Sequence, residues 1–338
     1  PMLVLGLETS CDETAAAILK DGDTLLSNII NDQIDIHSEY GGIVPELAGR
    51  SHNERVHRVI KESLQKADLE LRDIDLIAVT MGPGLIGSLL VGLNTAKGLS
   101  YGLRKPMIGV NHLEGHILAI YLQKKVKFPF IALVVSGGHT ELYRVSGFGQ
   151  YKLLGRTRDD AAGESFDKVG KMLGLPYPGG PAIEKLARNG NGNSHKFPRA
   201  HLEKGSLDFS FSGLKTSVRT FLNHRQQDST ITVTDEDISA GFQDAVLEVL
   251  VAKLIMACKR EKLSRIVVTG GVASNGALRE AVKKEAQCWG FESFFPDPIF
   301  CTDNAAMIAC AGYYKFVRDP SSSSLFKALD AKASLSIE

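Results

Sequence analysis

The chain has 338 residues, of which 43% are apolar and 23% are charged, as is usual for a globular protein and unlike a disordered one. Its 39 basic and 39 acidic side chains cancel, so it lacks the basic surplus with which proteins that bind nucleic acid alone neutralise phosphates. Contact with RNA would therefore use a local basic patch or a partner. The length exceeds that of one typical hydrophobic core and predicts two lobes.

The cysteines argue against both a disulfide framework and a thiolate zinc site, because they are odd in number and form no Cys-x-x-Cys pair. They are Cys11, Cys258, Cys288, Cys301 and Cys310. The apolar run 3–7 is too short for a signal peptide, and no apolar run approaches the roughly 20 residues that span a bilayer. We therefore expect a cytoplasmic protein with reduced thiols and no membrane contact.

The first part of the chain is typical of an antiparallel opening followed by a strand–glycine–helix unit. Strands are predicted over 3–10, 15–19 and 24–30, with polar turns between them. Helical spacing of apolar residues follows over 44–66, then a strand over 76–80, a glycine-rich segment over 82–87 and a helix through residue 98.

The same order restarts later in the chain. Strands are predicted over 130–136, 141–145 and 265–269, and two glycines then lead into a helix over 275–288. The repetition predicts a duplicated α/β fold, in which each lobe is a mixed sheet flanked by helices. We assign residues 1–127 to the first lobe, 128–325 to the second and 326–338 to a tail. Ligands of such folds bind at glycine-rich strand ends, so a cleft between the lobes is the expected site.

The second lobe contains a basic insertion near 185–235. Between residues 185 and 225, two acids accompany eight basic residues: Lys185, Arg188, Lys196, Arg199, Lys204, Lys215, Arg219 and Arg225. This segment is either a basic surface beside the cleft or an ordinary solvated insertion with uneven charge.

His112 and His116 are four residues apart, so a helix would place both imidazoles on one face as half of a divalent metal site. Packing or capping within a core explains the spacing equally well. A zincin protease would need glutamate directly after the first histidine, where this chain has Leu113. Asp303 could supply a third ligand, although its place before a predicted helix also suits an N-cap.

The segment Gly-Pro-Gly-Leu-Ile-Gly at 82–87 matches the dinucleotide-binding pattern formally. That reading requires an acid about 20 residues later, and none precedes Glu114. We reject dinucleotide binding and expect the glycines to permit close backbone packing or contact with a ligand.

Two other glycine turns follow predicted strands. Backbone amides in the turn 136–140, which holds Ser136, Gly137 and Gly138, could bind a phosphate, and the glycines in 268–275 could admit a nucleobase. Acidic residues accompany them. Glu8, Asp12 and Glu13 could orient water or accept a proton, or could simply form a solvated turn.

Asp167 and Glu184 would suit contact with ribose hydroxyls or an ammonium group. Turn formation and helix capping explain these two residues equally well.

In this order, the motifs resemble the tRNA adenosine threonylcarbamoyltransferases of the bacterial TsaD type over nearly the whole chain. The matching segments are ETSCDET (8–14), GPGLIG (82–87), HLEGH (112–116), VVSGGHT (134–140), GESFD (163–167), YPGGP (177–181), LDFSFSGLK (207–215), GGVASN (270–275) and CTDN (301–304). The resemblance implies the actin-like, ribonuclease-H-like two-lobe fold of the ASKHA ATPases. It also implies one divalent cation, iron or zinc, on His112, His116 and Asp303.

The resemblance further implies that threonylcarbamoyl-adenylate, whose adenine nucleotide is part of the substrate, binds a defined set of residues. These are Val134, Val135, Ser136, Gly137, Gly138, Asp167, Gly180, Glu184 and Asn275. Glu184 stands where the family often has aspartate. Val134 replaces a tyrosine ligand of archaeal and eukaryotic relatives, which favours the bacterial or organellar branch.

The implied reaction joins the threonylcarbamoyl group to the exocyclic amine of adenosine 37 in tRNAs that read codons beginning with A, and releases AMP. Asp12 or Glu13 is our candidate for removing the amine proton. The implied partners are tRNA, an inactive paralogue that forms a heterodimer, an ATPase subunit and a separate enzyme that makes the adenylate. The alternatives are a small-molecule kinase of the same fold, a metalloprotease, and a non-catalytic scaffold.

Overall fold

The computed structural model describes residues 1–200, 203, 205–323 and 329–337. The chain divides into two compact units. The first comprises Pro1–Lys127, Gly147–Tyr151 and Pro296–Glu338, and the second comprises Phe128–Ser146 and Lys152–Phe295.

The first unit is built on a five-stranded mixed sheet of order β3-β2-β1-β4-β5. Its strands are β1 (Leu3–Glu8), β2 (Thr14–Lys20), β3 (Thr24–Asn31), β4 (Leu76–Gly82) and β5 (Met107–Asn111). β2 pairs antiparallel with both β1 and β3, whereas β4 pairs parallel with β1 and β5. The parallel strands are almost wholly buried, as expected of strands covered on both faces.

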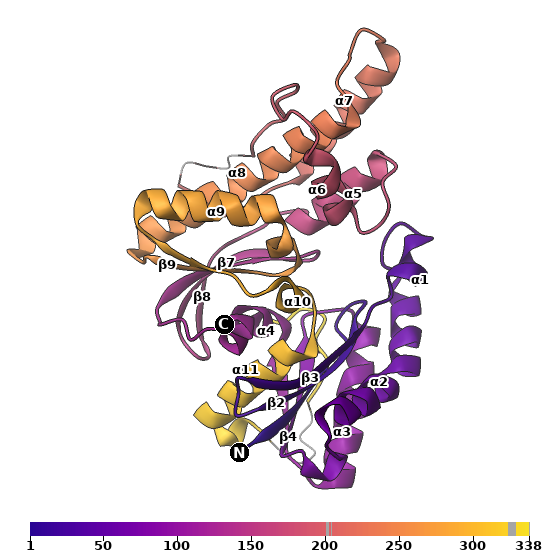
Figure 1. Ribbon diagram of the computed structural model, residues 1–338, viewed down its shortest axis with the longest axis vertical. Coiled ribbons are helices and arrows are strands. Elements are labelled where there is room, and N and C mark those ends of the chain that lie inside the picture. Colours follow the sequence, from indigo (N-terminus) through magenta and orange to yellow (C-terminus); the bar gives the residue numbers. More distant parts are fainter. Residues whose placement is uncertain (201–202, 204, 324–328, 338) are drawn as a thin grey trace. The chain divides into compact units, whose positions relative to one another are not determined.

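Helices cover both faces of this sheet (Figure 1). The helices of the first unit are α1 (Ile34–Ser38), α2 (Pro45–Ala67), α3 (Ile86–Leu103), α4 (His112–Leu118), α10 (Pro298–Cys301) and α11 (Ala305–Arg318), with short 3-10 helices at Leu71–Asp73, Ala119–Leu122 and Pro320–Ser322.

Leu5 and Leu7 of β1 belong to a core with Val56 of α2 and Leu93 of α3. The intervening Gly6 faces α11 so closely that a Cβ there would lie 2.3 Å from the carbonyl oxygen of Ala305. Because successive residues of a strand point to opposite faces, α11 packs on the face opposite to α2 and α3.

The second unit repeats the arrangement. Its sheet has the order β10-β9-β6-β7-β8, and β6 pairs antiparallel with β7 and parallel with β9. The strands are β6 (Phe130–Val135), β7 (Thr140–Gly147), β8 (Gln150–Arg156), β9 (Arg265–Thr269) and β10 (Glu292–Phe294). The helices are α5 (Ala162–Met172), α6 (Gly179–Ala187), α7 (Ser212–Gln227), α8 (Asp235–Glu261) and α9 (Gly276–Trp289), with a 3-10 helix at Gly271–Ser274.

The two sheets share one strand order and one pattern of parallel and antiparallel pairs, so the predicted duplicated α/β fold is confirmed. The ranges differ from the predicted lobes at the second boundary. Residues 296–325 were assigned to the second lobe, yet the described part of this segment belongs to the first unit. The reason is α11, whose small residues pack against β1 and β4: a Cβ at Gly312 would lie 2.5 Å from Ala78.

Part of the predicted tail, residues 326–328 and 338, and Lys204 of the basic insertion lie outside the described residues. The described remainder of the tail also packs with the first unit. None of the helices that the structure describes is both long and apolar enough to cross a membrane.

Candidate active site

The acidic turn between β1 and β2 is held by the glycine-rich loop before α3. Ser10 O accepts a hydrogen bond of 2.8 Å from Leu85 N, and a Cβ at Gly84 would lie 2.6 Å from the same oxygen. Thr9 Oγ1 donates to Ser88 O at 2.8 Å. The glycines thus permit close packing against the turn, as the sequence predicted after dinucleotide binding was rejected.

The predicted helix carries both histidines. α4 begins directly after β5, and its N-cap Asn111 accepts hydrogen bonds from Leu113 N at 2.8 Å and Glu114 N at 3.3 Å. The imidazoles of His112 and His116 meet edge to face with their centroids 4.7 Å apart, as expected at this helical spacing.

Asp303 precedes α11 and points its carboxylate at these rings. Its Oδ1 lies 3.1 Å from His116 Nε2 and 3.5 Å from His112 Nε2. The N-cap of α11 is Asn304, which accepts a hydrogen bond of 3.0 Å from Met307 N, so capping does not explain Asp303. Of the two readings of Asp303, the structure favours that of a side chain aimed at the two histidines.

The chemistry and spacing of these atoms fit a divalent cation. Two imidazole nitrogens and one carboxylate oxygen lie within 4.8 Å of one another. Ligands about 2.1 Å from a tetrahedral ion are roughly 3.4 Å apart, close to the two separations from Asp303 Oδ1. His112, His116 and Asp303 could therefore hold one metal ion.

Burial and charge shift the pKa values of this cluster in opposite directions. Burial raises the pKa of Asp303, but the two histidines outweigh it and leave that pKa well below its ordinary value. Burial opposes a charge on His112, yet Asp303 and Glu8 raise the pKa of this imidazole, whereas burial lowers the pKa of His116. A cation would displace the protons that the imidazoles share with Asp303.

The candidate bases Asp12 and Glu13 are consecutive residues of the turn between β1 and β2. Burial raises the pKa of both, that of Glu13 strongly, and the nearby charge of Asp303 adds to the increase. These are therefore poorly solvated groups beside the metal-binding cluster, unlike the solvated turn that was the alternative reading. A bound cation would reverse part of the influence of Asp303.

The sequence did not reveal that Glu8 faces a histidine of the candidate metal site. Its Oε2 accepts hydrogen bonds from Thr80 Oγ1 at 2.7 Å and from His112 Nδ1 at 3.1 Å. Sequence analysis grouped Glu8 with the acidic turn. It could not predict the contact with His112, because the two residues are 104 positions apart and no local pattern links them.

A buried histidine also supports the acidic turn. His52 of α2 donates through Nε2 to Cys11 O at 2.8 Å, and its Nδ1 accepts from Thr14 Oγ1 at 2.8 Å. Sequence reasoning missed His52 because its helical position looks like that of any core-facing residue.

The predicted nucleotide residues lie in the second unit. Val134 and Val135 have fully buried side chains on the central strand β6, so these side chains cannot face a ligand. Gly137 and Gly138 are exposed in the turn that follows, where Ser136 N donates to His139 O at 2.8 Å. Gly270 has φ +94° and a Cβ there would lie 2.3 Å from Val135 O, so this position requires glycine. The exposed turn can therefore offer backbone amides to a ligand, and the buried strand β6 holds this turn in place.

The other four predicted residues, Asp167, Gly180, Glu184 and Asn275, lie at or beside two hydrogen bonds within this unit. Asp167 of α5 accepts a hydrogen bond of 2.8 Å from Gly179 N, beside Gly180 at the start of α6. Glu184 of α6 accepts from Gly276 N at 3.0 Å, next to Asn275, the N-cap of α9. Gly179 and Gly276 are the first residues of α6 and α9, so helix capping, the alternative interpretation of Asp167 and Glu184, accounts for both contacts.

Of the seven basic residues of the insertion that the structure describes, four form ion pairs. These pairs are Arg188–Glu184, Arg199–Glu248, Lys215–Asp160 and Arg225–Asp235. The insertion is therefore less positive at its surface than the bare sequence indicates.

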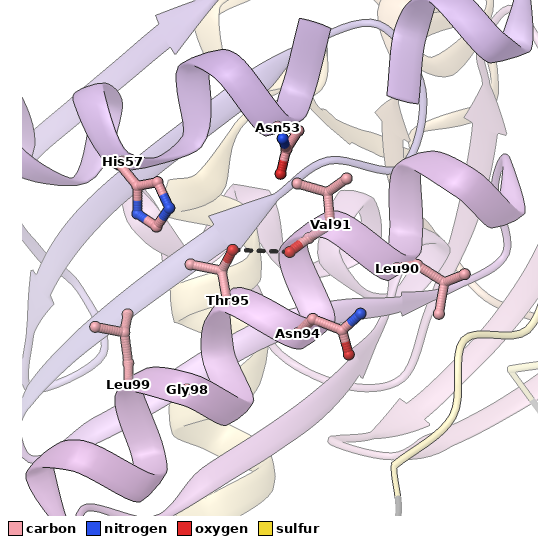
Figure 2. Close-up of a pocket in the computed structure, with 8 residues that line it drawn as sticks. All are labelled: Asn53, His57, Leu90, Val91, Asn94, Thr95, Gly98 and Leu99. Carbon is pink, nitrogen blue, oxygen red and sulfur yellow. Dashed lines mark hydrogen bonds between the residues drawn. The ribbon is translucent and has the colours of Figure 1, made fainter. Parts of the chain in front are cut away.

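A groove of about 450 Å³ lies between α2 and α3 (Figure 2). His57 is the one titratable group that lines it, and the hydrogen bond from Thr95 Oγ1 to Val91 O is internal to α3. No residue predicted for the metal or nucleotide site lines this groove.

The chain matches the family model described as "TsaD: tRNA N6-adenosine threonylcarbamoyltransferase" over residues 24–310. It is 52% identical to the tRNA N6-adenosine threonylcarbamoyltransferase of Clostridioides difficile (strain 630), over 94% of both chains. It is 54% identical to the enzyme of the same name from Geobacter sp. (strain M21), over 93% of this chain and 91% of that one.

Solved structures with low sequence identity confirm the fold alone. T. kodakarensis HypF aligns with 95% of this chain and 48% of its own at a TM-score of 0.66 and 14% identity. Component A of the Acidaminococcus fermentans (R)-2-hydroxyglutaryl-CoA dehydratase aligns with 94% of this chain and all of its own at a TM-score of 0.56 and 16% identity. The actin-like fold is thereby confirmed. Since the family model and these relatives cover most of its length, this chain belongs to the tRNA N6-adenosine threonylcarbamoyltransferase family.

Proposed function

We propose that this protein transfers the threonylcarbamoyl group from threonylcarbamoyl-adenylate to the exocyclic amine of adenosine 37 in tRNAs that read codons beginning with A, and releases AMP. The strongest support is the 52% identity to the tRNA N6-adenosine threonylcarbamoyltransferase of Clostridioides difficile over 94% of the chain. The convergence of His112, His116 and Asp303 supports it, because a metal-binding group is expected of this enzyme.

In the proposed reaction the amine nitrogen attacks the carbamoyl carbon, an N–C bond forms, and the bond from that carbon to the phosphate oxygen breaks. The amine proton passes to Asp12 or Glu13, since a raised pKa makes a carboxylate a stronger proton acceptor. AMP leaves with the electron pair of the broken bond.

We propose iron or zinc as the cation on His112, His116 and Asp303, since imidazole and carboxylate ligands suit both metals. When bound, it would supply Lewis-acid polarisation of a carbamoyl or phosphate oxygen. Glu8 and Asn111 would keep the two imidazoles in place, through the Nδ1 contact of His112 and the cap of α4.

For the adenylate we propose the exposed turn at Ser136, Gly137 and Gly138, with Asp167, Gly180, Glu184 and Asn275 beside it. Val134 and Val135 take part through backbone alone, because their side chains are buried. Glu184 is the candidate for the ribose hydroxyls, since its partly exposed carboxylate retains an oxygen beyond the contact with Gly276 N.

We further propose that the protein works in the cytoplasm with an inactive paralogue as heterodimer partner, an ATPase subunit and a separate enzyme that makes the adenylate. The zero net charge supports shared tRNA binding, and the absence of disulfides among the five cysteines suits a reducing compartment.

Reconstitution tests the function. Wild-type protein and His112→Ala would each be mixed with partner subunits, tRNA and threonylcarbamoyl-adenylate, and modified nucleoside and AMP would be measured by mass spectrometry. Wild type should form both in equal amounts, and His112→Ala neither. If the protein were a non-catalytic scaffold, the wild-type mixture would form neither the modified nucleoside nor AMP unless another subunit carried the transferase activity. A kinase would instead consume ATP without tRNA and be indifferent to His112.

A further inference from the structure

Glu8 is a fully buried carboxylate at the end of β1. An ionised carboxylate is costly to bury unless hydrogen bonds and an opposite charge compensate it. Its Oε1 accepts from Ser10 N, and its Oε2 accepts from Thr80 Oγ1 and His112 Nδ1. Three donors from the turn after β1, from β4 and from α4 therefore converge on one carboxylate.

The contact with His112 determines which of its nitrogens is available to a cation. A carboxylate accepts hydrogen bonds, so His112 donates to Glu8 through a proton on Nδ1. When a cation displaces the proton shared with Asp303, the lone pair available to that cation therefore lies on Nε2. Nε2 is the atom that faces Asp303 Oδ1 at 3.5 Å. Glu8 thus holds the imidazole of His112 through Nδ1, while Nε2 of the same ring points at Asp303.

We propose that Glu8 is a positioning residue that fixes the orientation and tautomer of His112 for a divalent cation. This inference rests on the metal centre proposed above. Carboxylates in this position typically strengthen metal binding by about 10- to 100-fold, because they orient the imidazole and raise its basicity.

The chain offers a matched control on α4 itself. Glu114 is also a buried glutamate, but its Oε1 accepts a hydrogen bond of 2.9 Å from Tyr151 Oη. Glu114→Gln and Glu8→Gln each replace a buried carboxylate by an amide of the same shape, so a general loss of stability affects both variants. Only Glu8→Gln changes the partner of a metal-binding histidine.

The experiment titrates metal-free full-length protein with Co²⁺, whose visible spectrum reports ligand geometry, and measures Zn²⁺ affinity by competition with a chelating dye. Glu8→Gln should bind Zn²⁺ about 10- to 100-fold more weakly than wild type with an altered Co²⁺ spectrum, and Glu114→Gln within about 2-fold of wild type. In a His112→Ala background, Glu8→Gln should cause no further loss, because its contact is already absent.

Equal Zn²⁺ affinity of Glu8→Gln and wild type would overturn the inference, as would an equal loss in Glu114→Gln. If Glu8→Gln does not fold, the Zn²⁺ affinity of Thr80→Val tests the inference instead. This variant removes the hydroxyl that donates to Glu8 Oε2, the oxygen that also accepts from His112. Weaker Zn²⁺ binding by Thr80→Val supports the inference and unchanged binding overturns it. A wild-type protein that binds neither ion would instead overturn the proposed metal centre.

Discussion

At the scale of single residues, the surroundings of four carboxyl groups divide them into two pairs. Glu8 and Asp303 contact imidazoles, and these contacts outweigh burial and lower the pKa of both carboxyl groups. Asp12 and Glu13 lack that compensation, so burial raises their pKa values. Carboxyl groups with pKa values shifted apart in one site suit different tasks. We assign the first pair to holding the site and the second to proton transfer.

This division predicts the behaviour of Asp12→Asn and Glu13→Gln. The variant that removes the base should lose about 10²- to 10⁴-fold in kcat, the usual contribution of a general base, and retain its metal. Single-turnover transfer to tRNA and metal analysis of the same sample would measure both. Full transfer activity in both variants, with metal bound, would rule out a role for either carboxylate.

The sequence predicted that His112 and His116 lie together better than it predicted what surrounds them. The i, i+4 spacing of His112 and His116 defines one helix face wherever the helix lies. Asp303 could not be assigned from sequence, because the preference of helix N-termini for aspartate and asparagine fits both Asp303 and Asn304. The structure resolves this through the bond from Met307 N to Asn304 Oδ1.

At the scale of elements, α4 is short and its start depends on Asn111. This side chain accepts two backbone hydrogen bonds of α4 and donates through Nδ2 to Leu335 O at 3.1 Å. Since loss of an N-cap typically costs about 0.5–2 kcal/mol, Asn111→Ala should lower the free energy of unfolding by about that amount and weaken metal binding as the helix frays. Urea unfolding and Zn²⁺ titration would measure the two effects.

Thr234→Ala is the control for a cap on a different helix, since Thr234 is the N-cap of α8 in the second unit. Asn111→Asp separates the two functions of Asn111, because aspartate keeps the accepting oxygen but cannot donate to Leu335 O. Stability and metal affinity of Asn111→Ala equal to those of wild type would show that the cap is dispensable.

The C-terminal segment could not be placed from sequence. Lys332 N donates to Met81 O at 2.8 Å, and Gly84 N donates to Ala333 O at 3.2 Å, so this segment packs on the end of β4. Backbone hydrogen bonds do not depend on side-chain type, so they leave no pattern in the sequence that could predict this packing. Residues 296–323 belong to the first unit for a different reason, the packing of small residues of α11 against β1 and β4.

At the scale of the whole molecule, the duplication was predictable because buried parallel strands appear as continuous apolar runs. The runs at β1, β4, β6 and β9 each contain few polar residues. β8 and β10 were not predicted, because most of their residues are partly or fully exposed and their sequences resemble loops.

We predict that the stability of the fold depends on pH through Asp159 of the second unit. Burial raises the pKa of Asp159, but hydrogen bonds from Ser210, Phe211 and Ser212 outweigh it, and the net pKa lies below its ordinary value. A carboxyl group whose folded pKa is lowered stabilises the fold above its unfolded pKa, and this contribution is lost as the pH falls through the folded value. The difference in Tm between wild type and Asp159→Asn should therefore be largest near neutral pH and shrink below about pH 4.

Differential scanning calorimetry from pH 7 to pH 2.5 would test this prediction. Asp160 offers a second case, since Lys168 and Lys215 lower its pKa against the effect of burial. A Tm difference between wild type and Asp159→Asn that stays constant across this range would show that the carboxylate charge does not stabilise the fold.

The proposed reaction depends on one cation held by His112, His116 and Asp303. The most direct measurement is the metal content of purified full-length protein, by inductively coupled plasma mass spectrometry, for wild type and for His112→Ala, His116→Ala and Asp303→Ala. We predict one iron or zinc ion per wild-type chain and its loss in each variant, with the secondary structure retained by circular dichroism. Folded variants that each keep the full metal content of wild type would contradict the claim.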